Sequence, residues 1–214
     1  MKQILVAVAL LTICLVPGVS RATTIFSDNF NGETQSLNHS PFAQWTVTNG
    51  TVDVIGDGGT FALLPLGNGN YVDLDGTAKD PGIMASTPFT LFAGQTYDFS
   101  FDYAGSQRGD THSLFVGFDF NNDGLIDFNS GGPILNVLTG TGLTSVFSSF
   151  LQGSDTTARI IFTQDPSNAD AGISNNIGLL VDNVKLTSVP EPASLMLLGA
   201  GLAAIGIWRR KAAR

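Results

Sequence analysis

The chain has 214 residues, enough for one domain with a proper core and too few for two large ones. Only 13% of the residues are charged, 43% are hydrophobic and 25 are glycine, which excludes a wholly disordered chain and favours an all-β protein with many turns. Residues 23–188 contain four basic and seventeen acidic residues, and this excess of thirteen negative charges makes nucleic acid an unsuitable partner. The single cysteine, Cys14, lies outside that stretch, which excludes disulfides and thiol catalysis from it.

Residues 1–22 have the layout of a signal peptide. Lys2 gives a short positive start, and an apolar run follows over residues 4–16. Small residues at Ser20 and Ala22 suit cleavage by signal peptidase. The run is short for a membrane span, so export with cleavage after Ala22 is expected.

Residues 23–188 are predicted to form one all-β domain, an antiparallel β-sandwich of the jelly-roll kind. The strongest signal is the alternation of apolar and polar residues, which is typical of half-buried strands. An Asn49-Gly50 turn predicts that residues 45–47 and 51–54 form a hairpin. Many short strands separated by glycine-rich turns favour a sandwich or jelly roll. The other predicted strands cover residues 96–103, 114–120, 158–162 and 178–186.

Several segments of this domain together resemble a known group of folds. Tyr71-Val72-Asp73-Leu74-Asp75-Gly76 comes first, Ala93-Gly94-Gln95-Thr96-Tyr97 follows, and Leu179-Leu180-Val181-Asp182-Asn183-Val184 closes the domain. This layout is similar to galactose-binding-like jelly rolls, a group that includes many carbohydrate-binding modules. The resemblance implies a fold and does not by itself imply a ligand.

The segment 119–127 matches the first nine positions of an EF-hand-type calcium loop. Ser130 stands where the bidentate glutamate of such a loop is expected. The same residues also suit a plain hairpin turn without metal, and the sequence leaves both interpretations open. The calcium ligands would be Asp119, Asn121, Asp123, the Leu125 carbonyl and Asp127.

Asp182 is a second candidate metal ligand. In a regular last strand, Asp182 shares a face with Leu180, Val184 and Leu186, and an inward carboxylate needs a partner. Carbohydrate-binding jelly rolls often tie their first and last strands with a structural calcium ion, and the resemblance implies that Asp28 and Asp182 could do so here. A bulge that turns Asp182 to solvent, or backbone hydrogen bonds to it, would account for the residue without metal.

Catalytic motifs are weak, so the chain is not expected to be an enzyme. The two histidines, His39 and His112, have no triad or zinc-site spacing. Arg108 and Asp110 are interpreted as a solvated loop pair. Trp45 and Tyr103 could stack on sugar rings, although core packing is the commoner role of such residues.

The C-terminal segment 189–214 has three parts. Val189, Pro190, Glu191 and Pro192 form an extended box, because the prolines disfavour helix there. An apolar stretch follows over residues 193–208, about 24 Å long as a helix and slightly shorter than a hydrocarbon core. We interpret this stretch as a transmembrane helix. The membrane stop is a basic end with Arg209, Arg210 and Lys211, expected to stay in the cytoplasm.

This tail closely resembles the PEP-CTERM sorting signal. The resemblance implies recognition by an exosortase, transient residence in the inner membrane, and release to the cell surface or matrix of a Gram-negative bacterium that makes exopolysaccharide. The expected function is therefore a non-enzymatic surface or matrix protein that contacts extracellular polysaccharide. The alternatives are a purely structural coat or adhesion protein and a glycan-acting hydrolase, for which a cleft with two carboxylates would be the sign.

Overall fold

The computed structural model describes residues 22–78, 81–129, 132–165, 176–189 and 193–212. Thr24–Ser188 form one compact unit, and the C-terminal helix α2 (Ala193–Ala212) belongs to another. The predicted signal peptide, apart from Ala22, lies outside the described residues, as do Pro190, Glu191, Pro192 and Ser130.

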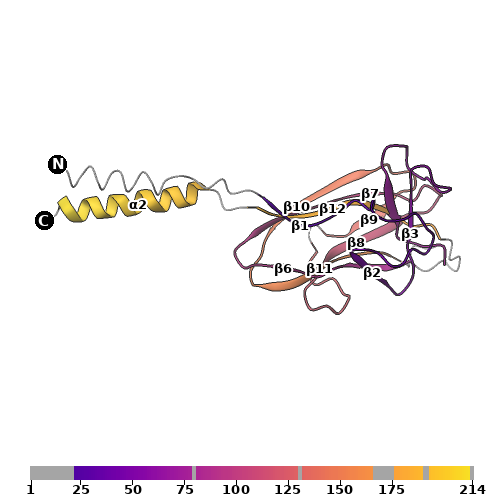
Figure 1. Ribbon diagram of the computed structural model, residues 1–214, viewed down its shortest axis with the longest axis horizontal. Coiled ribbons are helices and arrows are strands. Elements are labelled where there is room, and N and C mark those ends of the chain that lie inside the picture. The colour runs from indigo at the N-terminus through magenta and orange to yellow at the C-terminus, as the bar shows by residue number, and fades with distance from the viewer. Residues whose placement is uncertain (1–21, 79–80, 130–131, 166–175, 190–192, 213–214) are drawn as a thin grey trace. The chain divides into compact units, whose positions relative to one another are not determined.

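The domain is a sandwich of two antiparallel sheets of six strands each, which appear as two layers in Figure 1. In the first sheet the order is β10-β7-β12-β4-β3, with β1 paired to β12, and in the second it is β2-β5-β11-β8-β9, with β6 paired to β11. The strands of the first sheet are β1 (Thr23–Asp28), β3 (Asp53–Gly56), β4 (Asn70–Asp73), β7 (Thr96–Ala104), β10 (Thr144–Leu151) and β12 (Leu180–Val189). Those of the second sheet are β2 (Trp45–Thr48), β5 (Ile83–Ser86), β6 (Phe89–Leu91), β8 (His112–Asp119), β9 (Ile134–Val137) and β11 (Thr156–Gln164).

The predicted all-β sandwich is therefore confirmed. The alternation in β7 places Tyr97, Phe99 and Phe101 in the core, while Asp98 and Asp102 lie on the outer face of the first sheet. The predicted strands 96–103, 114–120, 158–162 and 178–186 correspond to β7, β8, β11 and β12. Their boundaries move by a few residues, since strand ends depend on pairing more than on local sequence.

The predicted hairpin between residues 45–47 and 51–54 is wrong. Both segments are extended, but β2 pairs with β5 in the second sheet, whereas β3 pairs with β4 in the first. Asn49 does adopt a positive φ of 54°, so the chain turns at this position as the sequence predicts. The chain turns a corner between the two sheets there, because both segments bury apolar side chains in the core from opposite layers.

The interior contains one main core and one smaller cluster. The main core fills the space between the sheets and is rich in phenylalanine, with Phe118 packed edge-on against Phe99. The smaller cluster includes Leu64, Tyr71 and Leu180. The Tyr71 hydroxyl accepts hydrogen bonds from the backbone N–H groups of Leu63 and Leu64, which anchors the loop between β3 and β4. This anchored loop forms one wall of the groove described below.

Helix α2 ends in the three basic residues Arg209, Arg210 and Lys211, as the sequence predicts. The interpretation as a transmembrane helix is not supported. Among the described residues, no helix combines the length and hydropathy needed to cross a bilayer. The physical reason is that the basic residues occupy the last turn and leave an apolar stretch of only about 16 residues where about 20 are needed.

Candidate functional site

A hollow with an apolar middle lies at the β3 end of the first sheet. β3 is the last strand of that sheet, and the segment 36–39 runs along its outer edge. The backbone N–H of Ser36 donates to the Val54 carbonyl at 2.9 Å, and the N–H of Val54 donates back to Ser36 at 3.0 Å. The anchored loop after β3 forms the opposite wall. Two hollows of about 250 and 110 Å³ lie between these walls and share Leu37, Ile55 and Phe61. We call the two hollows together the groove.

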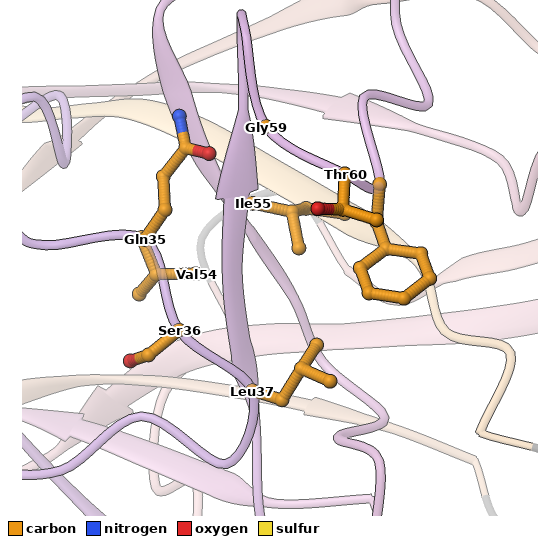
Figure 2. Close-up of a pocket in the computed structure, with 8 residues that line it drawn as sticks. Gln35, Ser36, Leu37, Val54, Ile55, Gly59 and Thr60 are labelled. Carbon is orange, nitrogen blue, oxygen red and sulfur yellow. The ribbon is translucent and has the colours of Figure 1, made fainter.

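The groove has an apolar middle. Figure 2 shows Leu37 and Ile55 pointing toward a common space, and Phe61 also lines this space. Ile55 is buried and forms the floor, whereas Leu37 is 41% and Phe61 51% exposed. A half-exposed phenylalanine beside a half-exposed leucine offers a flat apolar surface to a ligand, since exposed aromatic side chains are common anchors in binding sites.

The smaller hollow adds polar and charged groups. Asp53 and Asp73 are directly opposite each other on β3 and β4. Both oxygen atoms of the Asp53 carboxylate are engaged: it accepts the N–H groups of Asn38 at 2.7 Å and Thr77 at 3.0 Å, and the Thr77 hydroxyl at 2.8 Å. Asp73 accepts the N–H of Asp75 at 3.1 Å. The two acids are thus built into the floor of this hollow.

Arg108 closes the polar end of the groove. One of its Nη atoms lies 2.7 Å from the Asp73 carboxylate and also donates to the Asn176 carbonyl. Burial raises the pKa of Asp73 to about 8 despite this ion pair, and the neighbouring Asp53 and Asp75 carboxylates push it the same way, while the Asp75 N–H and Arg108 oppose the rise. The smaller hollow is therefore close to neutral or slightly negative near pH 7.

The five predicted calcium ligands lie in and next to the turn after β8, each in its own set of local hydrogen bonds. The Asp119 carboxylate accepts the N–H groups of Asn121, Asn122 and Gly124 at 3.1, 2.6 and 2.9 Å. Asp123 accepts the N–H of Leu125 at 2.8 Å. Asp127 accepts the N–H of Phe120 at 2.8 Å, and Phe118 is bridged to Phe128 as in a hairpin. These bonds hold the turn with or without a cation.

Calcium binding at this turn stays a prediction. In the described part of the chain, no group of three or more His, Cys, Asp or Glu side chains is placed to hold a metal ion. An ion at this turn would therefore depend on the Asn121 side chain and the Leu125 carbonyl in addition to the carboxylates.

We expect Asp119→Ala to lower the free energy of unfolding by about 2–3 kcal/mol in the presence of chelator, because the turn loses three hydrogen bonds to a buried charged acceptor. Asp123→Ala, which removes one exposed bond, should cost less than about 1 kcal/mol. Urea denaturation of both variants measures the difference. Equal losses in the two variants would contradict the role given to Asp119.

The same variants test the calcium prediction. A cation that binds only the folded chain raises the melting temperature by mass action. If the turn binds calcium, millimolar calcium raises the melting temperature of the native chain and not that of Asp123→Ala. A rise that persists in Asp123→Ala but disappears in Asp182→Ala assigns the ion to the other predicted site.

Asp28 and Asp182 lie within electrostatic reach of each other. Asp182 is 1% exposed, and burial raises its pKa to about 7, with smaller contributions from Asp102 and Asp28 against the lowering effect of the Asn183 N–H. Asn183 has a positive φ of 52°, so the strand is irregular at this point. Val184 and Leu186 share the main core as expected, whereas Leu180 packs in the smaller cluster, so the prediction that Leu180 lies on their face is wrong.

The predicted strand-tying calcium at this pair also stays a prediction. The Asp28 carboxylate already accepts the N–H of Phe30 and the Trp45 indole N–H, both at 2.9 Å. Asp182 accepts the N–H of Asn183 at 2.6 Å, one of the metal-free explanations considered from the sequence. A proton on Asp182 near neutral pH relieves the same repulsion that a cation would relieve.

The other candidates from the sequence have structural roles. Trp45 is buried between Phe26, Phe30 and Phe162, and Tyr103 packs against the core beside Phe101. Neither is placed as a sugar platform.

Arg108 pairs with Asp73 and not with Asp110, so the interpretation as a loop pair is wrong, and the reason is that the carboxylate partner comes from β4. The sequence did not identify Leu37 and Phe61, because they lie in loops that no periodic pattern marks, nor Asp73, whose pairing with Arg108 depends on the tertiary fold.

Comparisons with known proteins concern the C-terminal tail and the fold of the sandwich. Residues 188–211 match the family profile described as the PEP-CTERM protein-sorting motif. The chain carries a PEP-CTERM sorting motif. The motif's box begins as β12 ends, and its basic end is the last turn of α2. A search of curated proteins returns no match.

A solved structure shows the fold of the sandwich, and others are similar to parts of it. The CBM22-1 xylan-binding domain of Xyn10C from Paenibacillus barcinonensis is 9% identical, with a TM-score of 0.51 over 82% of this chain and 100% of that one. The CBM22-1–GH10 modules of Clostridium thermocellum xylanase 10B are 13% identical over 79% and 29%, with a TM-score of 0.46. The K1 cleaved adhesin domain of Lys-gingipain from Porphyromonas gingivalis is 11% identical over 79% and 99%, with a TM-score of 0.45. The first likeness shows a carbohydrate-binding-module-like jelly roll, in agreement with the resemblance seen in the sequence.

Proposed function

We propose that this chain is an exported, non-enzymatic protein of the cell surface or extracellular matrix that binds polysaccharide. The route rests on the sorting motif at residues 188–211, which implies processing by an exosortase after signal peptidase has acted. The destination is the surface or matrix of a Gram-negative bacterium, and exopolysaccharide is the polymer that the protein meets there.

The observation that carries the binding role is the groove with its half-exposed Phe61, on a fold shared with a xylan-binding domain. Carbohydrate ligands present both apolar C–H faces and hydroxyl groups. A site that combines an apolar platform with a few convergent polar groups matches both. Phe61 and Leu37 supply the apolar platform, and Thr77 and Arg108 supply the polar groups.

Hydrolysis fits the groove less well than binding does, although Asp53 and Asp73 are two carboxylates in one cleft. A glycosidase needs one carboxyl as acid and one as nucleophile or base, both in contact with the substrate. All the oxygen atoms of Asp53 are engaged by Asn38 and Thr77, and Asp73 is 1% exposed and covered by Arg108. Their hydrogen bonds and burial suit a structural role.

A screen of the exported protein against immobilised glycans, with and without calcium, tests the binding role. We expect retention on at least one polysaccharide and loss of most of that retention in Phe61→Ala. Cleavage of any retained glycan during the screen would replace the binding role with a hydrolytic one.

Processing gives a separate prediction. The mature protein should begin near Thr23 and lack residues 195–214, because both ends carry sorting signals. Intact-mass analysis of material from the cell exterior checks this. Recovery of the full chain with both Met1 and Arg214 would refute the processing scheme.

A further inference from the structure

The two hollows of the groove differ in how enclosed they are, and this difference indicates how a ligand would lie in them. The smaller hollow, with Asp53, Asp73 and Arg108, is the more enclosed, while the larger one lies more open to solvent along Ser36 and Thr60. Leu37, Ile55 and Phe61 belong to both and join them. A ligand seated here has one end in the more enclosed hollow beside Arg108, its middle on an apolar surface, and an exit to solvent.

The size of the groove limits what it holds. Sites that enclose drug-sized ligands measure about 300–1,000 Å³. The two hollows, at about 250 and 110 Å³, reach only the low end of that range together. The groove therefore has room for one or two sugar rings and not for a long run of a polymer.

The enclosed end is rigid. Arg108 is held by the Asp73 carboxylate and by the Asn176 carbonyl, and Asp73 is itself fixed by the Asp75 N–H. A guanidinium has five N–H donors in a fixed plane, and both of these contacts use a single Nη atom. The remaining donors can serve the hydroxyl groups that only a terminal sugar presents in that position.

The charge of the groove selects against acidic sugars. Among the described residues, Arg108 is the one lysine or arginine in its lining, and it is already paired with Asp73. Asp53 adds a carboxylate beside this pair. With the Asp53 carboxylate beside it, the Arg108 charge is offset even where Asp73 holds a proton, so a uronic acid would bring a further negative charge to a lining without net positive charge, which is unfavourable.

We propose that the groove binds the end of a neutral glycan chain, with one or two terminal sugar rings over Phe61 and Leu37 and the last hydroxyl groups at Arg108. This inference rests on the proposed function. It adds that the site is the groove, that the ligand is the end of a glycan chain, and that this glycan is neutral. The protein then recognises the tips of glycan chains and not their interior.

Titration calorimetry of the exported protein with oligosaccharide ladders of one to six units tests this. The probes are xylo-, cello-, laminari- and manno-oligosaccharides, with oligogalacturonates as the acidic series. We expect affinity to rise from one to two units and then to stay within about twofold up to six. Phe61→Ala should weaken binding at least about tenfold, and Leu37→Ala provides a second variant of the same surface. Phe147→Ala, an exposed phenylalanine on β10, is the matched control and should stay within about twofold.

The outcomes separate this inference from the proposed function. Affinity that keeps rising through four to six units overturns the chain-end site while leaving polysaccharide binding intact. Tightest binding of oligogalacturonates overturns the charge class, and binding lost in Phe147→Ala but kept in both groove variants overturns the position. Failure of the native protein to retain any polysaccharide in the screen overturns the proposed function itself.

Discussion

Replacing Phe101 by alanine is expected to lower the free energy of unfolding by about 3–5 kcal/mol, the usual cost of removing a buried phenylalanine ring. Phe101 is 1% exposed and lies at the centre of the main core. Its ring packs edge-on against Phe162 of the opposite sheet, with centroids 5.2 Å apart, and against Phe99 at 5.5 Å. The loss combines the transfer free energy of the ring with the cavity that the rigid sheets cannot close.

Phe147→Ala is the matched control, because Phe147 lies on the neighbouring strand β10 and is 68% exposed. We expect it to change stability by no more than about 0.5 kcal/mol. Urea denaturation followed by near-ultraviolet circular dichroism measures both variants. A loss below about 1 kcal/mol for Phe101→Ala, or equal losses for the two variants, would contradict the assignment of the core.

Stability should fall as the pH rises from about 4 to about 8. The cause is Asp73, whose pKa burial raises from the ordinary value of 3.8 to about 8. Between these values the folded chain holds a proton that the unfolded chain has released, so raising the pH favours unfolding. Each unit of pKa difference corresponds to about 1.4 kcal/mol, and the loss attributable to this group is on the order of 5 kcal/mol. Asp182, whose pKa burial raises to about 7, acts in the same direction.

Asp73→Asn isolates this effect, since the amide keeps an acceptor for the Asp75 N–H but cannot ionise. We expect the variant to lose much less stability than the native chain between pH 5 and pH 8.5, and to be at least as stable at pH 8.5. Asp98→Asn, a half-buried residue of the outer face of β7, serves as the control and should keep the native profile. Stability that is flat or increases over this interval in the native chain would disprove the assignment.

The architecture could be predicted from the sequence because it depends on local periodicity. The alternation of β7 and β11 specifies which side chains enter the core whatever their partners are. Strand pairing could not be predicted from local periodicity. The segments around Asn49-Gly50 have the composition of a hairpin, yet β2 and β3 belong to opposite sheets, and that choice is made by contacts with β5 and β4 far along the chain.

The candidate sites likewise include some that the sequence could identify and one that it could not. The turn at Asp119 could be found because its spacing is local, and the pair of Asp28 and Asp182 was suggested by a resemblance. The groove could not be found, because Leu37, Phe61 and Arg108 come from three loops whose only common feature is their position in space. Asp73 gives no local sign of its burial, which results from the smaller cluster and from Arg108 above it.

Binding of polysaccharide through the groove is the main part of the proposed function. The most direct measurement is retention of the native protein, Phe61→Ala and Phe147→Ala on a panel of immobilised neutral and acidic polysaccharides. We expect the native protein and Phe147→Ala to be retained on the same neutral polysaccharide. We expect Phe61→Ala not to be retained. Absence of retention on every polysaccharide, or equal retention of all three proteins, would contradict it.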